Sequence, residues 1–191
     1  MTKKRIAVLV SGSGSNLQAL IDACAAPDFP AQIVLVLSNK PEAHGLTRAN
    51  NAGLNTAVIS HKDFETREAF DKKIDATLHA HDVQIVCLAG FMRVLSAWFV
   101  KKWCGKMINI HPSLLPKYKG LHTHQRAIDA GEKEAGCSVH WVSAEVDEGE
   151  IIVQARVPVL AGDTAETLAA RVLEQEHKLY PEALRKIAQA I

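Results

Sequence analysis

The sequence lacks Cys-x-x-Cys pairs, long apolar runs near its start, and any excess of charge of one sign. The first apolar run ends at Ser11-Gly12, too early for a signal peptide or a membrane span, so we expect a cytoplasmic protein without membrane contact. The cysteines stand far apart among apolar residues, which indicates free thiols in a reducing compartment rather than disulfides: Cys24, Cys87, Cys104 and Cys137.

The charge balance argues against a polyanionic partner. Lys and Arg number 22 against 21 Asp and Glu, a net charge of +1, so no nucleic-acid surface is expected, although one small phosphate can still bind locally. Hydrophobic residues make up 48% and charged residues 23% of 191 residues, which are ordinary globular values. We therefore expect one domain over residues 1–191, and the sequence leaves a homodimer open.

Apolar runs alternate with helical spacing along the chain. Strands are expected at 6–10, 33–37, 56–59 and 83–89. Between them, helical spacing begins at Leu17, a short helix is expected at 46–52, and a longer one should run from Asp63 or Thr66 to about Ala80. Such alternation predicts an α/β fold, a doubly wound and mostly parallel sheet flanked by helices. Further strands at 107–110, 137–142 and 151–157 bring the expected number to about seven. A long final helix should begin with Asp163 as N-cap, and Pro181 should kink or break it.

A glycine-rich loop follows the first strand. Gly14, Ser15 and Asn16 come between a buried run and a helix, where backbone N–H groups and the helix dipole suit a phosphate. The third glycine of a dinucleotide motif and the Gly-Lys-Ser/Thr of an ATP loop are both missing, so a dinucleotide or nucleoside triphosphate is disfavoured. The alternative is a tight turn with a serine as the helix N-cap.

The stretch 107–116 is the expected chemical centre. Its first half alternates apolar and polar residues, so Asn109 and His111 leave a short strand on the same side before prolines rigidify the chain. An amide and an imidazole so placed can converge on one polar atom of a ligand. The alternative is a satisfied polar pair at a strand end. A zinc site with His122 and His124 is disfavoured because no further ligands have the usual spacing.

Three other segments carry candidate site residues. Residues 90–95 follow the fourth strand and suit a slot for a flat ring, or else simply begin the next helix. Asp147 lies in an acidic connector and is expected to orient an imidazole and raise its pKa, or else to belong to a solvated turn. Glu176 falls on the apolar stripe of the last helix, so it should be paired or turned to a cleft.

Five segments resemble the folate-dependent phosphoribosylglycinamide formyltransferases of purine biosynthesis. The resemblance covers nearly the whole chain and rests on Ser11-Gly12-Ser13-Gly14-Ser15-Asn16, Leu88-Ala89-Gly90-Phe91-Met92-Arg93, Asn109-Ile110-His111-Pro112-Ser113-Leu114-Leu115-Pro116, Gly120-Leu121-His122-Thr123-His124 and Gln175-Glu176-His177. It implies a Rossmann-like fold, and formyl transfer from 10-formyltetrahydrofolate, a co-substrate, to the amine of glycinamide ribonucleotide, without a metal.

The resemblance also implies roles for individual residues. Gly14, Ser15 and Asn16 would hold the phosphate, with Glu176 near the substrate amine. The catalytic set would be Asn109, His111 and Asp147. The folate pocket would be lined by Arg67, Met92, Arg93, Val94, Leu95, Asn109, Ser143, Ala144, Glu145, Val146 and Asp147.

The sequence departs from the family pattern at three places. Ser13 stands where Asn is frequent, Lys119 where Pro is frequent, and Glu148-Gly149-Glu150 where a Gly-Gly-Pro-like run is common. The third departure falls on the expected folate side, but Asp147 is retained. Two other functions stay open at this point, hydrolysis of formyl-folate and noncatalytic nucleotide sensing in a Rossmann-like cleft.

Overall fold

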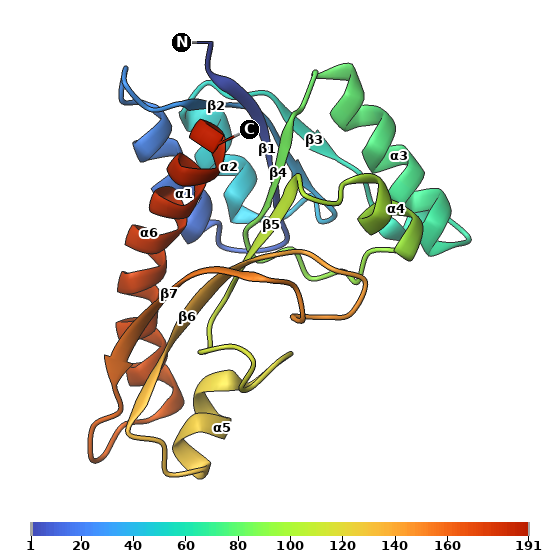
Figure 1. Ribbon diagram of the computed structural model, residues 1–191. Coiled ribbons are helices and arrows are strands. Elements are labelled where there is room, and N and C mark those ends of the chain that lie inside the picture. The colour runs from blue at the N-terminus through green and yellow to red at the C-terminus, as the bar shows by residue number, and fades with distance from the viewer. Residues whose placement is uncertain (1, 191) are drawn as a thin grey trace.

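The computed structural model describes residues 2–190 and has a single seven-stranded sheet (Figure 1). The strand order is β3-β2-β1-β4-β5-β6-β7. The first five strands in this order pair in parallel. The last two pairings, β5 with β6 and β6 with β7, are antiparallel. The predicted doubly wound, mostly parallel sheet is therefore confirmed. The strands are β1 Lys4–Val10, β2 Ala31–Ser38, β3 Thr56–Val58, β4 Ile85–Leu88, β5 Met107–His111, β6 Glu134–Trp141 and β7 Ile151–Pro158.

Helices cover both faces of the sheet. The α-helices are α1 Ser15–Cys24, α2 His44–Asn51, α3 Arg67–Ala80, α4 Ala97–Lys102, α5 Thr123–Asp129 and α6 Ala165–Ala190, and a 3₁₀ turn, η1, spans His61–Asp63. In Figure 1, α1 and α6 lie on one side of the sheet and α3 and α4 on the other. None of the helices in the described part of the chain is long and apolar enough to cross a membrane.

Alternate residues of β1, β2 and β4 enter two separate cores. Ile6 and Val8 of β1 pack with residues of α1 and α6, whereas Ala7 and Leu9 pack with residues of α3 and α4. Successive side chains of a strand point to opposite faces, so a strand covered on both sides must be apolar throughout. This requirement explains the continuous apolar runs in the sequence.

The final helix differs from the prediction at two points. It continues through Pro181 rather than breaking there, because buried residues on both sides of the proline, such as Tyr180 and Leu184, hold it against the sheet. Asp163 is not the N-cap, since the helix begins at Ala165 and the Oγ1 of Thr164 accepts from the N–H of Thr167. Asp163 instead forms an ion pair with Arg171 at 2.7 Å.

Candidate active site

The strand order reverses between β1 and β4. At this point Ser11 connects the loop after β1 with the segment after β4. The chain winds outward from β1 to β3 and then returns to β4 beside β1, which creates the crevice where open α/β sheets bind ligands. Ser11 donates its N–H to the carbonyl of Gly90 at 3.1 Å, and its Oγ accepts from the N–H of Met92 at 2.8 Å. The glycine loop and the segment after β4 are therefore held side by side.

The glycine loop leaves the start of α1 without a side-chain cap. Gly14 takes the N-cap position with φ 71°, a left-handed conformation that suits glycine. The alternative of a serine N-cap is wrong, because no side chain caps this helix. The N–H groups of its first turn have no intrahelical acceptors, so they can bind an anion.

Asn16 connects this loop to the last helix. Its Nδ2 donates to Oε2 of Glu176 at 2.6 Å. Glu176 is only 7% exposed, and burial raises the pKa of its carboxyl, opposed by the bond from Asn16. Of the two expectations for Glu176, the structure shows the paired one, and the pairing places Glu176 beside Gly14, Ser15 and Asn16, which are predicted to bind the substrate.

The central strand pairs its two polar residues with polar residues of β6. In the antiparallel register Asn109 lies opposite His140, and His111 lies opposite Ser138. Nδ2 of Asn109 lies 3.2 Å from Nε2 of His140. The carbonyl of Trp141 lies 2.9 Å from Nδ1 of His140 and can only accept, so that nitrogen carries a hydrogen.

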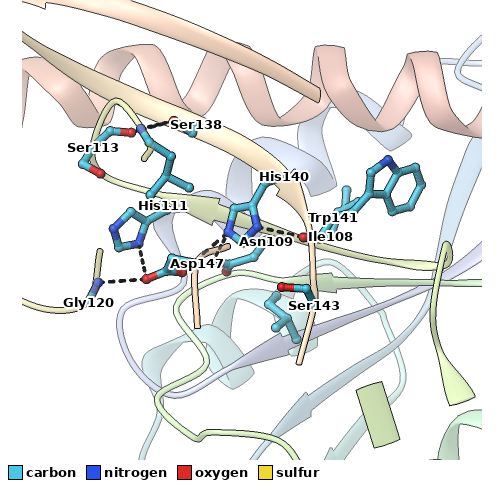
Figure 2. Close-up of polar contacts among 12 residues, drawn as sticks. Ile108, Asn109, His111, Ser113, Gly120, Ser138, His140, Trp141, Ser143 and Asp147 are labelled. Carbon is cyan, nitrogen blue, oxygen red and sulfur yellow. Dashed lines mark hydrogen bonds and ion pairs between the residues drawn. The ribbon is translucent and has the colours of Figure 1, made fainter. Parts of the chain in front are cut away.

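Asp147 lies between two imidazole rings, as Figure 2 shows. Its Oδ2 is 3.4 Å from Nδ1 of His111, and its Oδ1 is 3.6 Å from Nε2 of His140. The N–H of Gly120 also donates to Oδ2 at 2.9 Å. Burial raises the pKa of Asp147, but the contacts with His140, Gly120 and His111 outweigh burial and hold it below its usual range. The predicted partnership of Asp147 with an imidazole is therefore confirmed.

Asp147 raises the pKa of His111, as predicted, but the net pKa of His111 lies below its usual value because of burial. His111 is buried, and burial lowers its pKa more than the carbonyl of Tyr118 and the Asp147 carboxylate raise it. Nε2 of His111 donates to the Tyr118 carbonyl at 3.0 Å, so Nδ1 carries a hydrogen only in the charged ring. Asp147 thus stabilises the protonated, charged form of His111, whereas burial destabilises that form.

A cavity of about 140 Å³ adjoins these residues. It contains most of the expected folate-side residues together with His140 and apolar residues from the segments after β4 and β6. The lining is Leu88, Phe91, Arg93, Val94, Leu95, Val100, Asn109, His140, Val142, Ser143, Ala144, Glu145, Val146 and Asp147. A cavity is therefore present after β4, where the slot was expected.

Three predicted residues do not line this cavity. Met92 is 63% exposed and contributes only its backbone N–H to the contact with Ser11. Arg67 is exposed at the first position of α3. His111 is not in the lining, because it lies on the other side of Asp147 from Asn109 (Figure 2). A larger cavity, about 500 Å³, lies beside residues 112–118 and α5 and contains none of the three predicted catalytic side chains.

Sequence reasoning missed three contributors to this site. His140 was expected only as a strand residue, and the Tyr118 carbonyl and Gly120 N–H were expected only as parts of a loop. The sequence does contain a pattern that indicates His140, because the polar residues Ser138 and His140 alternate with the apolar Cys137 and Val139. All four of these residues are buried in β6. Backbone contacts such as those of Tyr118 and Gly120 leave no comparable pattern.

No cluster suited to a metal ion occurs among residues 2–190. There the side chains of His, Cys, Asp and Glu do not gather in groups of three or more with ligand geometry. His122, from the disfavoured zinc hypothesis, instead takes the N-cap position of α5 with φ 58°.

Comparisons with known proteins agree with this geometry. A model of the formyl transferase family matches residues 4–184. The phosphoribosylglycinamide formyltransferase of Escherichia coli strain K12 is 49% identical over 176 residues, 92% of this chain and 83% of that protein. The trifunctional purine biosynthetic protein adenosine-3 of Bos taurus is 55% identical over 97% of this chain, but this chain spans only 18% of its length.

A solved structure supports the same assignment. The crystal structure of phosphoribosylglycinamide formyltransferase from Brucella melitensis superposes with a TM-score of 0.94 at 56% identity, covering 98% of this chain and 96% of that one. The similarity therefore extends over both cores and both halves of the cleft. The chain belongs to the formyl transferase family.

Proposed function

We propose that this protein is a phosphoribosylglycinamide formyltransferase, which moves the formyl group of 10-formyltetrahydrofolate to the amine of glycinamide ribonucleotide. The observation that carries the proposal is the contact between Asn16 and Glu176. It places a loop suited to a phosphate beside a carboxylate suited to an amine, and glycinamide ribonucleotide has both groups. The apolar cavity after β4 provides room for a pterin on the other side of Asn109.

The reaction begins when the amine nitrogen attacks the formyl carbon carried on N10 of the folate. The new carbon–nitrogen bond produces a tetrahedral intermediate whose oxygen is negatively charged. Asn109 lines the cavity, and its amide can donate to this oxygen. One such donor lowers the barrier by about 3–4 kcal/mol, roughly a hundred- to a thousandfold in rate.

His111 and Asp147 supply and move protons in the proposed mechanism. For His111 to donate to the oxygen, its Nε2 must leave the Tyr118 carbonyl, while Asp147 stabilises the charged ring from the Nδ1 side. The attacking amine loses one proton and N10 gains one as the carbon–N10 bond breaks. Asp147 reaches the cavity and can relay that proton.

The test is an assay of formyl transfer by the purified protein. Tetrahydrofolate and formylated ribonucleotide should appear in equal amounts when both substrates are present, and Asn109→Ala should lower kcat by roughly a hundred- to a thousandfold. Asn51→Ala, on the exposed end of α2, is the matched control and should leave kcat unchanged. Formate release that is independent of glycinamide ribonucleotide would instead identify a hydrolase and overturn the proposal.

A further inference from the structure

The first turn of α2 holds the back of the glycine loop. The N–H of Gly45 donates to the carbonyl of Gly12 at 3.0 Å, and Nε of Arg48 donates to the carbonyl of Ser13 at 2.8 Å. The ring of His44 lies 3.3 Å from that same Ser13 carbonyl. Two successive loop carbonyls are therefore bonded to α2, which leaves the N–H groups at the start of α1 as the free polar groups of the loop.

Two glycines allow this close approach. A Cβ on Gly14 would lie 2.5 Å from the Cα of Gly45, and a Cβ on Gly45 would lie 3.0 Å from Cγ2 of Val10. A side chain at Gly14 would push α2 away from the loop, whereas one at Gly45 would press on the side chain of Val10 in β1. The loop conformation thus depends on α2 as well as on its own glycines.

A cavity of about 350 Å³ opens beside this contact. It is lined by residues of three helices, namely Ser15, Gln18, Ala19, Asp22, Arg48 and His177. Ser15 belongs to the predicted phosphate loop, so the cavity adjoins the place where the phosphate of the proposed substrate would bind. It lies on the α1 and α6 side of the sheet, apart from the cavity that contains Asn109.

The cavity has an uncommitted positive charge and an uncommitted donor. Within residues 2–190 Arg48 forms no ion pair, and besides Ser13 its guanidinium contacts only Oε1 of Gln18, at 3.5 Å. Nε2 of His177 is buried and has no hydrogen-bond partner in the described part of the chain. The single acid in the lining, Asp22, accepts from Gln18 at 2.9 Å.

We propose that Arg48 determines affinity for the phosphorylated substrate in two ways. Through Nε it fixes the Ser13 carbonyl and so holds the loop, and through its remaining donors it presents charge to the phosphate, with His177 as a second donor. A planar guanidinium suits both tasks, because its donors point in fixed directions. This inference rests on the proposed function and adds the side chains that select a phosphorylated amine.

The test compares Arg48→Gln and Arg48→Lys with the wild-type protein. The expected result for R48Q is a KM for glycinamide ribonucleotide about ten- to a hundredfold higher, the range for losing a hydrogen bond to a charged group, with an unchanged KM for 10-formyltetrahydrofolate. Inhibition by inorganic phosphate should weaken by the same factor. R48K should show a smaller effect, because it keeps the charge but loses the fork. Arg185→Gln, which removes an exposed ion pair with Asp28, is the matched control.

The possible outcomes separate this inference from the proposed function. If R48Q keeps its KM for the ribonucleotide, or if both substrate KM values rise together, the role of Arg48 is wrong. If R48Q does not fold, R48K decides by the same ratio of the two KM values. Should the wild-type protein transfer no formyl group, the proposed function fails, but stabilisation by inorganic phosphate that is lost in R48Q and partly kept in R48K would still support the anion site.

Discussion

Asn16 and Glu176 are joined by a hydrogen bond of 2.6 Å although 160 positions separate them in the chain. The bond connects the first turn of α1, directly after the glycine loop, with the middle of α6. The proposed amine site therefore forms only when the last helix packs beside the first.

Replacing Glu176 with Gln should weaken substrate binding without destabilising the fold. An amide accepts a hydrogen bond from the amine less strongly than a carboxylate, so the KM for glycinamide ribonucleotide should rise about tenfold. Burial raises the pKa of Glu176, so the wild-type carboxyl favours folding at low pH and loses that contribution as pH rises through its folded pKa. The melting temperature of Glu176→Gln should vary less with pH over that window. A lower melting temperature at every pH would contradict this account.

Replacing Asp147 with Asn should shift the dependence of rate on pH. Asp147 raises the pKa of His111 against the larger effect of burial, so its removal lowers that pKa further. If the charged ring donates to the oxygen, the rate falls as pH rises through the His111 pKa, and in Asp147→Asn this fall moves to lower pH. At neutral pH we expect kcat to drop about a hundredfold or more, the usual size of a general acid–base contribution.

The control for this variant is Asp129→Asn, which alters an exposed acid on α5 that contacts only Gln125. Its profile should match that of the wild-type protein. An unchanged profile in Asp147→Asn as well would show that Asp147 does not act on His111.

Replacing Gly149 with Ala should disrupt the site without touching a catalytic side chain. A Cβ there would lie 1.6 Å from the carbonyl oxygen of Trp141 and 3.4 Å from Nδ1 of His140. The loop that carries Asp147 must then move, so both kcat and the free energy of unfolding should fall, the latter by about 1–3 kcal/mol. Gly162→Ala meets no atom within 4 Å, so its backbone strain should cost about 1 kcal/mol while kcat is kept. Full activity in Gly149→Ala would show that the loop tolerates the shift.

Replacing Tyr180 with Phe tests how α6 is held on the sheet. The fully buried hydroxyl donates to the carbonyl of Leu88 at 2.8 Å and lies 3.3 Å from that of Ile108. Its loss leaves buried carbonyls with fewer donors, which should lower the free energy of unfolding by about 1–3 kcal/mol in urea titrations. Both substrate KM values should stay the same, because no substrate is expected at this position. Unchanged stability would mean that the two carbonyls are satisfied without the tyrosine.

The fold could be predicted from the sequence because parallel strands covered on both faces must be continuously apolar. The runs at 6–10 and 83–89 show this directly, and β1 and β4 are indeed neighbours at the centre of the sheet. The break predicted at Pro181 does not occur, because local helix preference takes no account of the packing of Tyr180 and Leu184 on either side.

The site could be predicted only in part. The placement of Asn109, Asp147 and Glu176 followed from strand alternation, loop chemistry and the family resemblance. The pairing of Asn109 with His140 depends on an antiparallel register that no local pattern specifies. The lowered pKa of His111 depends on how deeply the ring is buried, which is a property of the assembled fold rather than of its sequence neighbours.

Each of the two hydrophobic cores lies behind one of the two proposed binding regions. Residues that support the proposed phosphate loop, such as Val10 and Leu17, pack with α1 and α6, whereas Phe91 and Leu95, which line the proposed folate cavity, pack with α3 and α4. Substitutions behind one face should thus tune recognition of the one-carbon acceptor, and those behind the other face should tune recognition of the donor. Evolution or a protein engineer can in this way adjust the handling of each reactant separately within one small chain.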